Sequence, residues 1–472
     1  MKGRLLQNLS VNAVQLVANQ VLGLGIFYIL STGLDKHSFG EINLALAILL
    51  AAFNILSCGI DQLVVKKIAA GDDIKSTLSL YFCHVIFTGL VFYGIVLGAY
   101  LFAPASDLLY WLLALIGAGK LLIFFSTPFK QVANGMERFK LLAYMLVISN
   151  LVRCAGLILL SVFGGLTLHN IVMLFIAGDA AELLFCILIF VFSSKITLVI
   201  KWDQVKYFRL LREALPQTGV VLLTSALARF DWIFIGLLVS AEKLAEYSFA
   251  YKLFEISSLP LLAIAPLLIP RFTKVFGQNT VPVEQLKLLV RVEMIIAAFT
   301  ILMLNICWSP VIDAITTGKY GLVNVKTIFI LSLCLPFIYI NNFFWTIYFA
   351  QGHLKMILRS FVITFTVNVA GDVLLIPFFK NEGAAFAFLA ASVVQFLYFT
   401  KQNKLAQLNT AWQPLVISTM CAIACGVIAK LLFQNSWLTL IASVVLYGLS
   451  LIATRQIRLD DLPAFKSLRS KN

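Results

Sequence analysis

The sequence predicts an all-α polytopic membrane protein with about fourteen transmembrane helices, built as two six-helix lobes plus two additional C-terminal helices. Three observations lead to this fold class. Of the 472 residues, 61% are hydrophobic and only 12% are charged, whereas an ordinary soluble domain is about 45–50% apolar and about 25% charged. The apolar residues form stretches long enough to cross a bilayer, and the positive charges gather in alternate connections. This composition excludes a soluble enzyme, a nucleic-acid-binding protein and a disordered scaffold.

A helix needs about 20 mostly apolar residues to cross the hydrocarbon core of a membrane. Fourteen segments meet this requirement: 10–31, 40–63, 78–103, 108–127, 141–163, 170–193, 214–239, 246–270, 290–314, 326–350, 357–378, 383–401, 412–433 and 436–454. The first follows Lys2 and Arg4 but has no small-residue cleavage site after a short apolar core. We therefore expect it to be a transmembrane helix and not a cleaved signal peptide.

The distribution of Lys and Arg tests this set of helices, because these residues collect in cytoplasmic loops. With the N-terminus inside, the cytoplasmic segments hold 26 of the 36 Lys and Arg residues. The outer side holds only Lys36, Lys243, Lys319, Lys326, Lys380 and Lys430. The net charge of +14 is thus explained by topology, with no need for a nucleic-acid partner, and both termini are predicted to be cytoplasmic.

The spans divide the chain into five parts. We expect an N-terminal lobe at 1–194, a cytoplasmic linker at 195–213, a C-terminal lobe at 214–401, two further spans within 402–454 and a basic cytoplasmic tail at 455–472. The linker mixes Trp202, Tyr207 and Phe208 with Lys and Arg. Such a mixture is typical of an amphipathic segment on the inner leaflet, although a plain connection between lobes has equal support.

Two cytoplasmic connections are similar to each other, which indicates an internal repeat. Ala133-Asn134-Gly135 follows the fourth span and Ala350-Gln351-Gly352 follows the tenth, and basic residues come after both. Each lobe then holds six spans in the same orientation. Parallel repeats of this kind are a transporter architecture, in which the substrate is handled between the repeats.

Four segments together resemble the polysaccharide-transporter branch of the multidrug/oligosaccharidyl-lipid/polysaccharide (MOP) flippase superfamily. They are the stretch 59–66, the stretch 135–140, the stretch 211–216 leading to Arg229-Phe230-Asp231, and the stretch 247–252 followed by Pro260, Pro266 and Pro270. The resemblance covers essentially the whole chain. It implies a V-shaped pair of lobes, alternating access, and export of lipid-linked sugars as in O-antigen (Wzx-type) flippases.

The resemblance also implies the partners and the location. The substrate would be an undecaprenyl-pyrophosphate-linked oligosaccharide repeat unit for O-antigen, capsule or exopolysaccharide synthesis, carried across the bacterial cytoplasmic (inner) membrane. Membrane lipids, an H⁺ or Na⁺ counter-ion and a polysaccharide polymerase complex are the other expected partners. We expect no catalysis, no metal and no organic cofactor, and no nucleic acid.

Basic residues inside predicted spans are the first candidates for binding phosphate, because ionisable groups at membrane depth are costly unless paired or hydrated. Arginine can hold phosphate oxygens in a bidentate fork, and lysine supplies a point charge. Arg229 and Lys252 rank first, because the seventh and eighth spans line the cleft in the resembled family; Arg153 and Lys120 follow. The alternative is internal ion pairing, of Arg229 with Asp231 or Asp179 and of Lys252 with Glu255.

Acidic and amide side chains in the spans have separate predicted roles. Asp231, Glu255, Asp179 and Glu182 are candidates for coupling transport to a proton or sodium gradient, or else they neutralise neighbouring cations. Asn12, Gln15 and Asn19 recur at helical spacing on one face of the first span. They would contact sugar hydroxyls or form interhelical hydrogen bonds.

Two other functions compete with the flippase. One is a MATE-like drug/cation antiporter of the same superfamily, which an acidic cleft and twelve spans would favour. The other is a membrane-bound polysaccharide polymerase or ligase, which would need a large outer loop or a catalytic cluster. The intramembrane Arg and Lys residues, the fourteen spans and the short outer connections favour the flippase.

Overall fold

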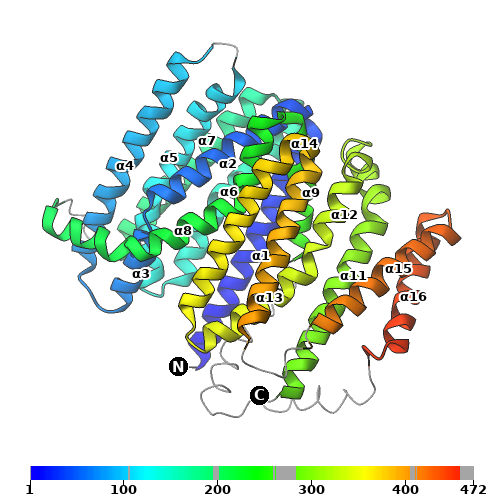
Figure 1. Ribbon diagram of the computed structural model, residues 1–472. Helices are drawn as coiled ribbons and strands as arrows, with labels where there is room; N and C mark the ends of the chain where they lie inside the picture. Colours follow the sequence, from blue (N-terminus) through cyan, green and yellow to red (C-terminus); the bar gives the residue numbers. More distant parts are fainter. Residues whose placement is uncertain are drawn as a thin grey trace. The chain divides into compact units, whose positions relative to one another are not determined.

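Every regular element in the described part of the chain is a helix (Figure 1). The computed structural model describes residues 2–104, 107–194, 201–258, 261, 283–403, 410 and 412–457. These residues form two compact units, Met1–Ala245 and Glu246–Asn472. The predicted all-α class is confirmed. Pro260, Pro266 and Pro270, which belong to the fourth segment of the family resemblance, lie outside the described residues, as does the chain after residue 457.

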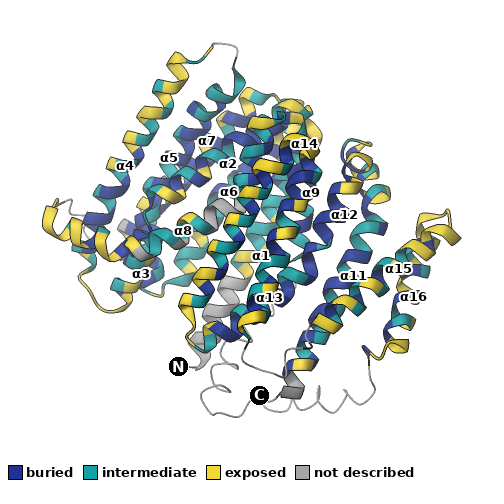
Figure 2. Cartoon of the chain, in the orientation of Figure 1, coloured by how far each residue is buried: buried dark blue, intermediate teal, exposed yellow. Residues whose placement is uncertain are grey.

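The first unit is built around one central helix. Its helices are α1 (Lys2–Gly33), α2 (Lys36–Leu56), α3 (Ile60–Ala69), α4 (Ile74–Phe102), α5 (Leu108–Gly135), α6 (Phe139–Val162), α7 (Leu168–Ser194) and α8 (Gln204–Leu238). Helix α5 packs against α2, α3, α4 and α7, while α6 packs against α1 and α7. Figure 2 shows the exposed residues of α4 concentrated in its second half. The inside of this unit therefore lies along α5.

Aspartates mark several helix starts in the first unit. The side chains of Asp35, Asp73, Asp107 and Asp203 each accept hydrogen bonds from backbone N–H groups in the first turn of the next helix. Such N-caps satisfy donors that have no partner within the helix. Partial burial acts to raise the pKa of Asp35, but hydrogen bonds from Ser38 outweigh it and keep that pKa below its usual value.

The second predicted span is interrupted. The prediction of one helix over 40–63 is wrong in detail, because Cys58 and Gly59 adopt left-handed backbone conformations (φ 50° and 66°) and separate α2 from α3. The backbone carbonyl of Cys58 accepts a hydrogen bond from Thr218 Oγ1 at 2.7 Å. A Cβ on Gly59 would lie 2.9 Å from the Gln217 side chain, so α8 fits here only against a glycine.

The predicted linker, 195–213, is helical from Gln204 and continues without a break into α8. Residues 195–200 lie outside the described part. The His84 ring nitrogen Nδ1 and the Tyr207 hydroxyl are 2.9 Å apart, so this start of α8 contacts α4. Helix α8 belongs to the first compact unit; the division into transporter lobes at 194 and 214 stays a prediction.

The second unit begins within α9 (Ala241–Ser257), whose first five residues belong to the first unit. Its other helices are α11 (Val283–Thr316), a short 3₁₀ helix η1 (Leu322–Asn324), α12 (Val325–Ser332), α13 (Cys334–Ala350), α14 (Leu354–Gln402), α15 (Trp412–Leu432) and α16 (Ser436–Ala453). Helices α15 and α16 pack on α11, where Leu302, Cys425 and Tyr447 form a buried cluster with their neighbours. The Tyr447 hydroxyl donates to the Ile295 carbonyl at 3.1 Å.

Helix α14 is a hairpin of two helices. Lys380 has non-helical dihedral angles (φ 51°, ψ −125°) in the middle of it. A Cβ on Gly383 would lie 2.5 Å from the Leu375 carbonyl oxygen, and one on Gly371 would lie 2.8 Å from Ala387 Cβ. These contacts require the chain to reverse direction near Lys380. The two predicted spans in this region are thus the two arms of one hairpin.

Eleven helices in the described residues are long and apolar enough to cross a membrane. This set counts the α14 hairpin once and does not include α8 or α9, which carry the seventh span and the start of the eighth. A polytopic membrane protein is therefore confirmed, and the total of fourteen spans stays a prediction.

The two similar connections of the predicted repeat have the same turn geometry. Glu137 and Gly352 both have left-handed backbones (φ 57° and 77°). The next residues, Arg138 and His353, each donate a backbone N–H to the carbonyl five residues earlier at 2.9 Å. This is the Schellman end of a helix. When the two turns are aligned on their left-handed residues, Glu137 matches Gly352. Gly135 then lies two residues before its counterpart Gly352, so the two Ala-x-Gly triplets themselves do not align.

Close packing of α2 against the start of α9 gives a stability prediction. A Cβ on Gly40 would lie 1.8 Å from the Ala241 carbonyl oxygen, while one on Gly98 in α4 would meet nothing within 4 Å. We expect Gly40→Ala to destabilise the protein by about 1–3 kcal/mol through overpacking. Gly98→Ala should be neutral or stabilising, since alanine favours helix. Thermal unfolding of both purified variants in detergent would compare them, and equal melting temperatures would contradict the packing.

Candidate functional site

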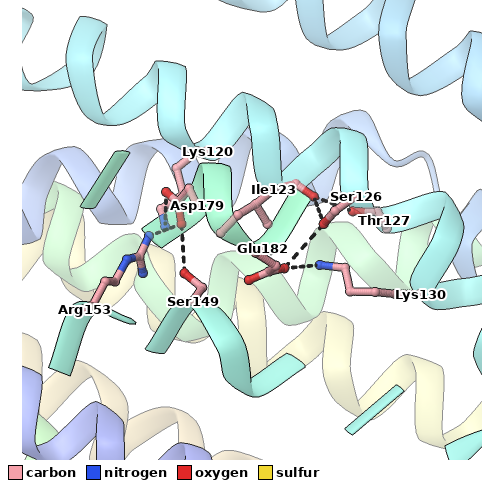
Figure 3. Close-up of polar contacts among 9 residues, drawn as sticks. All are labelled: Lys120, Ile123, Ser126, Thr127, Lys130, Ser149, Arg153, Asp179 and Glu182. Atoms are coloured by element: carbon pink, nitrogen blue, oxygen red, sulfur yellow. Dashed lines mark hydrogen bonds and ion pairs between the residues drawn. The ribbon is translucent and has the colours of Figure 1, made fainter. Parts of the chain in front are cut away.

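Five ionisable side chains from three helices lie together inside the first unit (Figure 3). They are Lys120 and Lys130 on α5, Arg153 on α6, and Asp179 and Glu182 on α7, and each residue is at most 8% exposed. The three helices are apolar spans, so these charges lie at membrane depth. Asp179 and Glu182 are one helical turn apart, which places both carboxylates on the same side of α7. We call these five residues the buried charge cluster.

Asp179 is the centre of one half of the cluster. Its Oδ2 lies 3.5 Å from Lys120 Nζ, and its Oδ1 accepts a hydrogen bond from Ser149 Oγ at 3.1 Å. Arg153 Nη2 forms an ion pair with the same Oδ1. The carboxylate fits between the helices because α5 has a glycine opposite it: a Cβ on Gly119 would lie 2.6 Å from Oδ2.

Arg153 has a second kind of contact. Its guanidinium carbon lies 4.7 Å from the centroid of the Phe175 ring, a geometry that stabilises a cation by its interaction with the aromatic face. A Cβ on Gly178 would lie 2.8 Å from Arg153 Cγ, so this glycine also makes room for the side chain. Arg153 Nε is buried and donates no hydrogen bond to any of the described residues. The guanidinium therefore keeps one unused donor at membrane depth.

Glu182 is the centre of the other half. Lys130 Nζ lies 2.7 Å from Glu182 Oε1, and Ser126 Oγ lies 3.3 Å from the same oxygen. Lys130 and Glu182 are 8% and 5% exposed. The ion pair is thus shielded from water, and removal of one partner would leave the other as an uncompensated buried charge.

The buried charge cluster contains three basic and two acidic residues. With all five ionised, it has one positive charge in excess. In a medium of low dielectric constant this excess attracts an anion much more strongly than it would in water. The arrangement can therefore hold the helices together, and its excess positive charge can attract an anion that reaches it.

Helix α8 carries Arg229, one of the two basic residues that ranked first among the sequence predictions, together with Asp231. Arg229 is half-buried, with its guanidinium carbon 4.5 Å from the centroid of the Trp232 ring. Asp231 is buried, and its Oδ1 accepts a hydrogen bond from the Trp232 backbone N–H at 2.8 Å. Asp179, one of the partners considered for Arg229, is paired with Lys120 and Arg153.

Helix α9 carries the other first-ranked residue. Lys252 Nζ lies 2.8 Å from Glu255 Oε2, one turn later in the same helix. The internal ion pair considered as the alternative for these two residues is present in this structure. Glu255 remains the more exposed partner, with 38% of its side chain accessible against 18% for Lys252.

The polar face of α1 contacts α6. Asn19 Oδ1 accepts a hydrogen bond from Asn150 Nδ2 at 3.2 Å, which is an interhelical hydrogen bond of the kind found in membrane bundles. Gln15 is half-buried. The side chain of Asn12 lies outside the described residues.

Sequence reasoning missed Lys130 as a member of the cluster. The predicted fourth span, 108–127, ends before Lys130, but this residue lies within α5, which continues to Gly135. The available signal was the apolar sequence that continues through Phe129 and Val132. Ser126 and Ser149 carried no signal, because serines are common in membrane helices for many reasons.

The comparisons with known proteins assign the family. The model of a family described as "Polysaccharide biosynthesis protein" matches residues 5–276. This stretch is more than half of the chain. The chain belongs to the polysaccharide biosynthesis protein family. No curated protein is a significant match to the sequence.

Solved structures show which fold this member of the family has. It is similar to the lipid II flippase MurJ in an inward closed conformation, with TM-score 0.74 and 13% identity over 94% of this chain and 98% of that one. A multidrug resistance MATE family transporter of the MOP superfamily in an inward-facing conformation matches with TM-score 0.66 and 15% identity, over 83% and 97%. A MOP superfamily transporter from Pyrococcus furiosus matches with TM-score 0.51 and 14% identity, over 84% and 92%. These matches confirm the predicted fold class and the resemblance to the MOP superfamily.

The Lys130–Glu182 pair gives a prediction that tests whether burial, and not only the distance between the charges, sets the loss of stability when an ion pair is broken. We expect Lys130→Met and Glu182→Gln each to lower stability by about 3–5 kcal/mol, because each leaves an uncompensated buried charge. The double variant Lys130→Met/Glu182→Leu should recover most of this loss. Melting temperatures of the purified variants would measure both effects.

The matched control for these variants is the Lys67–Glu213 pair, which has the same 2.7 Å separation but side chains that are 24% and 40% exposed. An exposed pair contributes about 0–1 kcal/mol, so Lys67→Met should change the melting temperature little. Equal losses for Lys67→Met and Lys130→Met would refute the special role of burial.

Proposed function

We propose that this protein is a flippase that moves an undecaprenyl-pyrophosphate-linked oligosaccharide repeat unit across the bacterial cytoplasmic membrane by alternating access. The glycan would serve O-antigen, capsule or exopolysaccharide synthesis. Membership of the polysaccharide biosynthesis protein family and a MOP superfamily fold support a transporter in this process. The observation that carries the choice of substrate is the positive excess of the buried charge cluster (Figure 3).

The substrate's pyrophosphate has about two negative charges, and its movement through a medium of low dielectric constant requires cations to balance them. Lys120 and Arg153 now balance Asp179. A phosphate that binds these two cations displaces Asp179. The displaced carboxylate then needs a different cation, a proton or Na⁺, and this requirement ties substrate binding to ion binding. In the same way, a phosphate that binds Lys130 displaces Glu182, which now pairs with it.

The remaining candidate residues have supporting roles in this proposal. Arg229 and Lys252 provide further cations for the phosphates, with Asp231 and Glu255 as their nearby ion-coupling carboxylates. Asn12, Gln15 and Asn19 contact sugar hydroxyls along α1. Both termini are cytoplasmic, and a polysaccharide polymerase receives the exported unit on the outer side.

A second candidate function is a MATE-like drug/cation antiporter. The similarity to a multidrug resistance MATE family transporter favours it. A cationic substrate needs an excess of carboxylates, however, and the buried charge cluster has an excess of cations. A polymerase or ligase is a weaker third candidate, because family and fold are shared with transporters.

Cells that lack this chain provide the test of substrate and direction. We expect a complete oligosaccharide repeat unit, linked to undecaprenyl pyrophosphate, to accumulate on the cytoplasmic leaflet. Extraction of lipid-linked sugars, combined with a leaflet-specific labelling of the glycan, would identify it. Normal surface glycan with unchanged lipid-linked pools would exclude the flippase, and cation-drug efflux would then be measured.

Arg229 provides the test of the charge assignment. We expect Arg229→Ala to abolish glycan export while the protein reaches the membrane at its normal level, because a phosphate-binding cation is lost. Arg229→Lys should restore part of the export, since lysine keeps the positive charge but lacks the bidentate hydrogen bonds of the guanidinium. The control is Lys75→Ala at the exposed start of α4, which should export normally. Normal export by Arg229→Ala would remove this residue from the substrate path.

A further inference from the structure

A cavity of about 750 Å³ with basic residues in its lining lies in the second unit, where α13 turns into α14. Its lining comes from two places: the turn with the first residues of α14, and the last turns of α14 at Tyr398, Gln402 and Asn403. These places are neighbours because α14 is a hairpin. The positive-inside pattern puts this end of the unit at the cytoplasmic surface.

The described residues that line the cavity carry positive charge without a counter-charge. Its lining includes His353, Lys355 and Arg359 and no Asp or Glu. No ion pair joins Lys355 or Arg359 to an acidic side chain in the described ranges. In the first unit, by contrast, Lys67 pairs with both an Asp and a Glu. The natural partner of this cavity is therefore an anion.

The helix dipole and side-chain amides add to the positive potential in the same place. The side chain of His353, the N-cap of α14, makes no capping bond, and the first turn of α14 carries the positive end of the helix dipole. Gln351, Gln402 and Asn403 supply side-chain amides. Lysine, arginine and amide donors around a helix start are a combination suited to phosphate oxygens.

The apolar part of the lining indicates that this anion belongs to a lipid. Tyr348, Tyr398, Leu354 and Met356 also face the cavity. Leu354 is 59% exposed, and Leu358 beside it on α14 is 44% exposed. Tyrosines with exposed leucines and basic residues are typical of the membrane interface, where acyl chains meet headgroups.

We propose that this cavity binds the phosphate headgroup of an anionic phospholipid of the inner leaflet, with Lys355 and Arg359 as its two cations. The site is separate from the buried charge cluster, which lies in the first unit, and the proposal does not depend on the transported substrate. Loss of both cations should weaken the binding about 25-fold, since each contributes about a fivefold factor at a membrane surface.

The turn after α5 supplies a matched control. Lys140 and Lys355 each lie three residues after the left-handed residue of equivalent turns, and both are exposed. Lys140 does not line this cavity. Lys140→Ala therefore removes a positive charge at the same position of a similar turn but leaves the proposed site intact.

The experiment is a titration of the purified full-length protein in detergent with short-chain phosphatidylglycerol. The melting temperature is measured at each lipid concentration. We expect the wild type and Lys140→Ala to be stabilised over the same concentration range. Lys355→Ala/Arg359→Ala should need about 25-fold more lipid for the same shift. Both side chains are exposed, so this variant should fold, and Lys355→Gln/Arg359→Gln provides a second version of it.

Three outcomes would overturn the proposal. An unchanged titration of the double variants would show that these cations do not bind the lipid. An equal shift with phosphatidylcholine would show that acyl chains alone act. An equal shift with inorganic phosphate, at the same concentrations, would show that the site takes a free anion and not a lipid headgroup.

Discussion

The absence of water in the hydrocarbon core is the constraint on which this structure depends. A backbone polar group at that depth must find its partner within the protein, and the helix achieves this within one segment. The constraint is clearest where a helix stops. At the break between α2 and α3 the chain turns through Cys58 and Gly59, and Thr218 of α8 donates a hydrogen bond to the Cys58 carbonyl. An interruption of a helix thus fixes the position of a neighbour.

The same constraint organises the charges. Asp179 and Glu182 on α7 each require a cation, and α5 and α6 supply three. Gly119 and Gly178 allow the helices to approach closely enough for these pairs. Packing and electrostatics are therefore not separable in this part of the first unit. The contacts that hold α5, α6 and α7 together are also those that an anionic ligand would have to enter.

Sequence reasoning predicted the helices well because hydropathy is summed over twenty or more residues and tolerates local exceptions. It failed where one residue decides the outcome. The left-handed backbone at Cys58 has no compositional signal, and the fourth span was predicted to end at residue 127, before Lys130, whereas α5 continues to Gly135. Pairs within one helix, such as Lys252 with Glu255, follow from spacing. The partners of Asp179 come from two other helices, and only packing selects Lys120 and Arg153 in place of Arg229.

The hairpin of α14 has a consequence for how the chain enters the membrane. Its arms touch through Gly371 and Ala387 and through Leu375 and Gly383, residues close enough in sequence that closing the loop costs little chain entropy. The two arms can therefore associate as soon as both have left the ribosome, before α15 is synthesised. Lys380 sits at the tip of this hairpin. Glu382 follows two residues later. Insertion as a pair carries these two opposite charges through the hydrocarbon together, at the leading end, where they emerge into water on the far side.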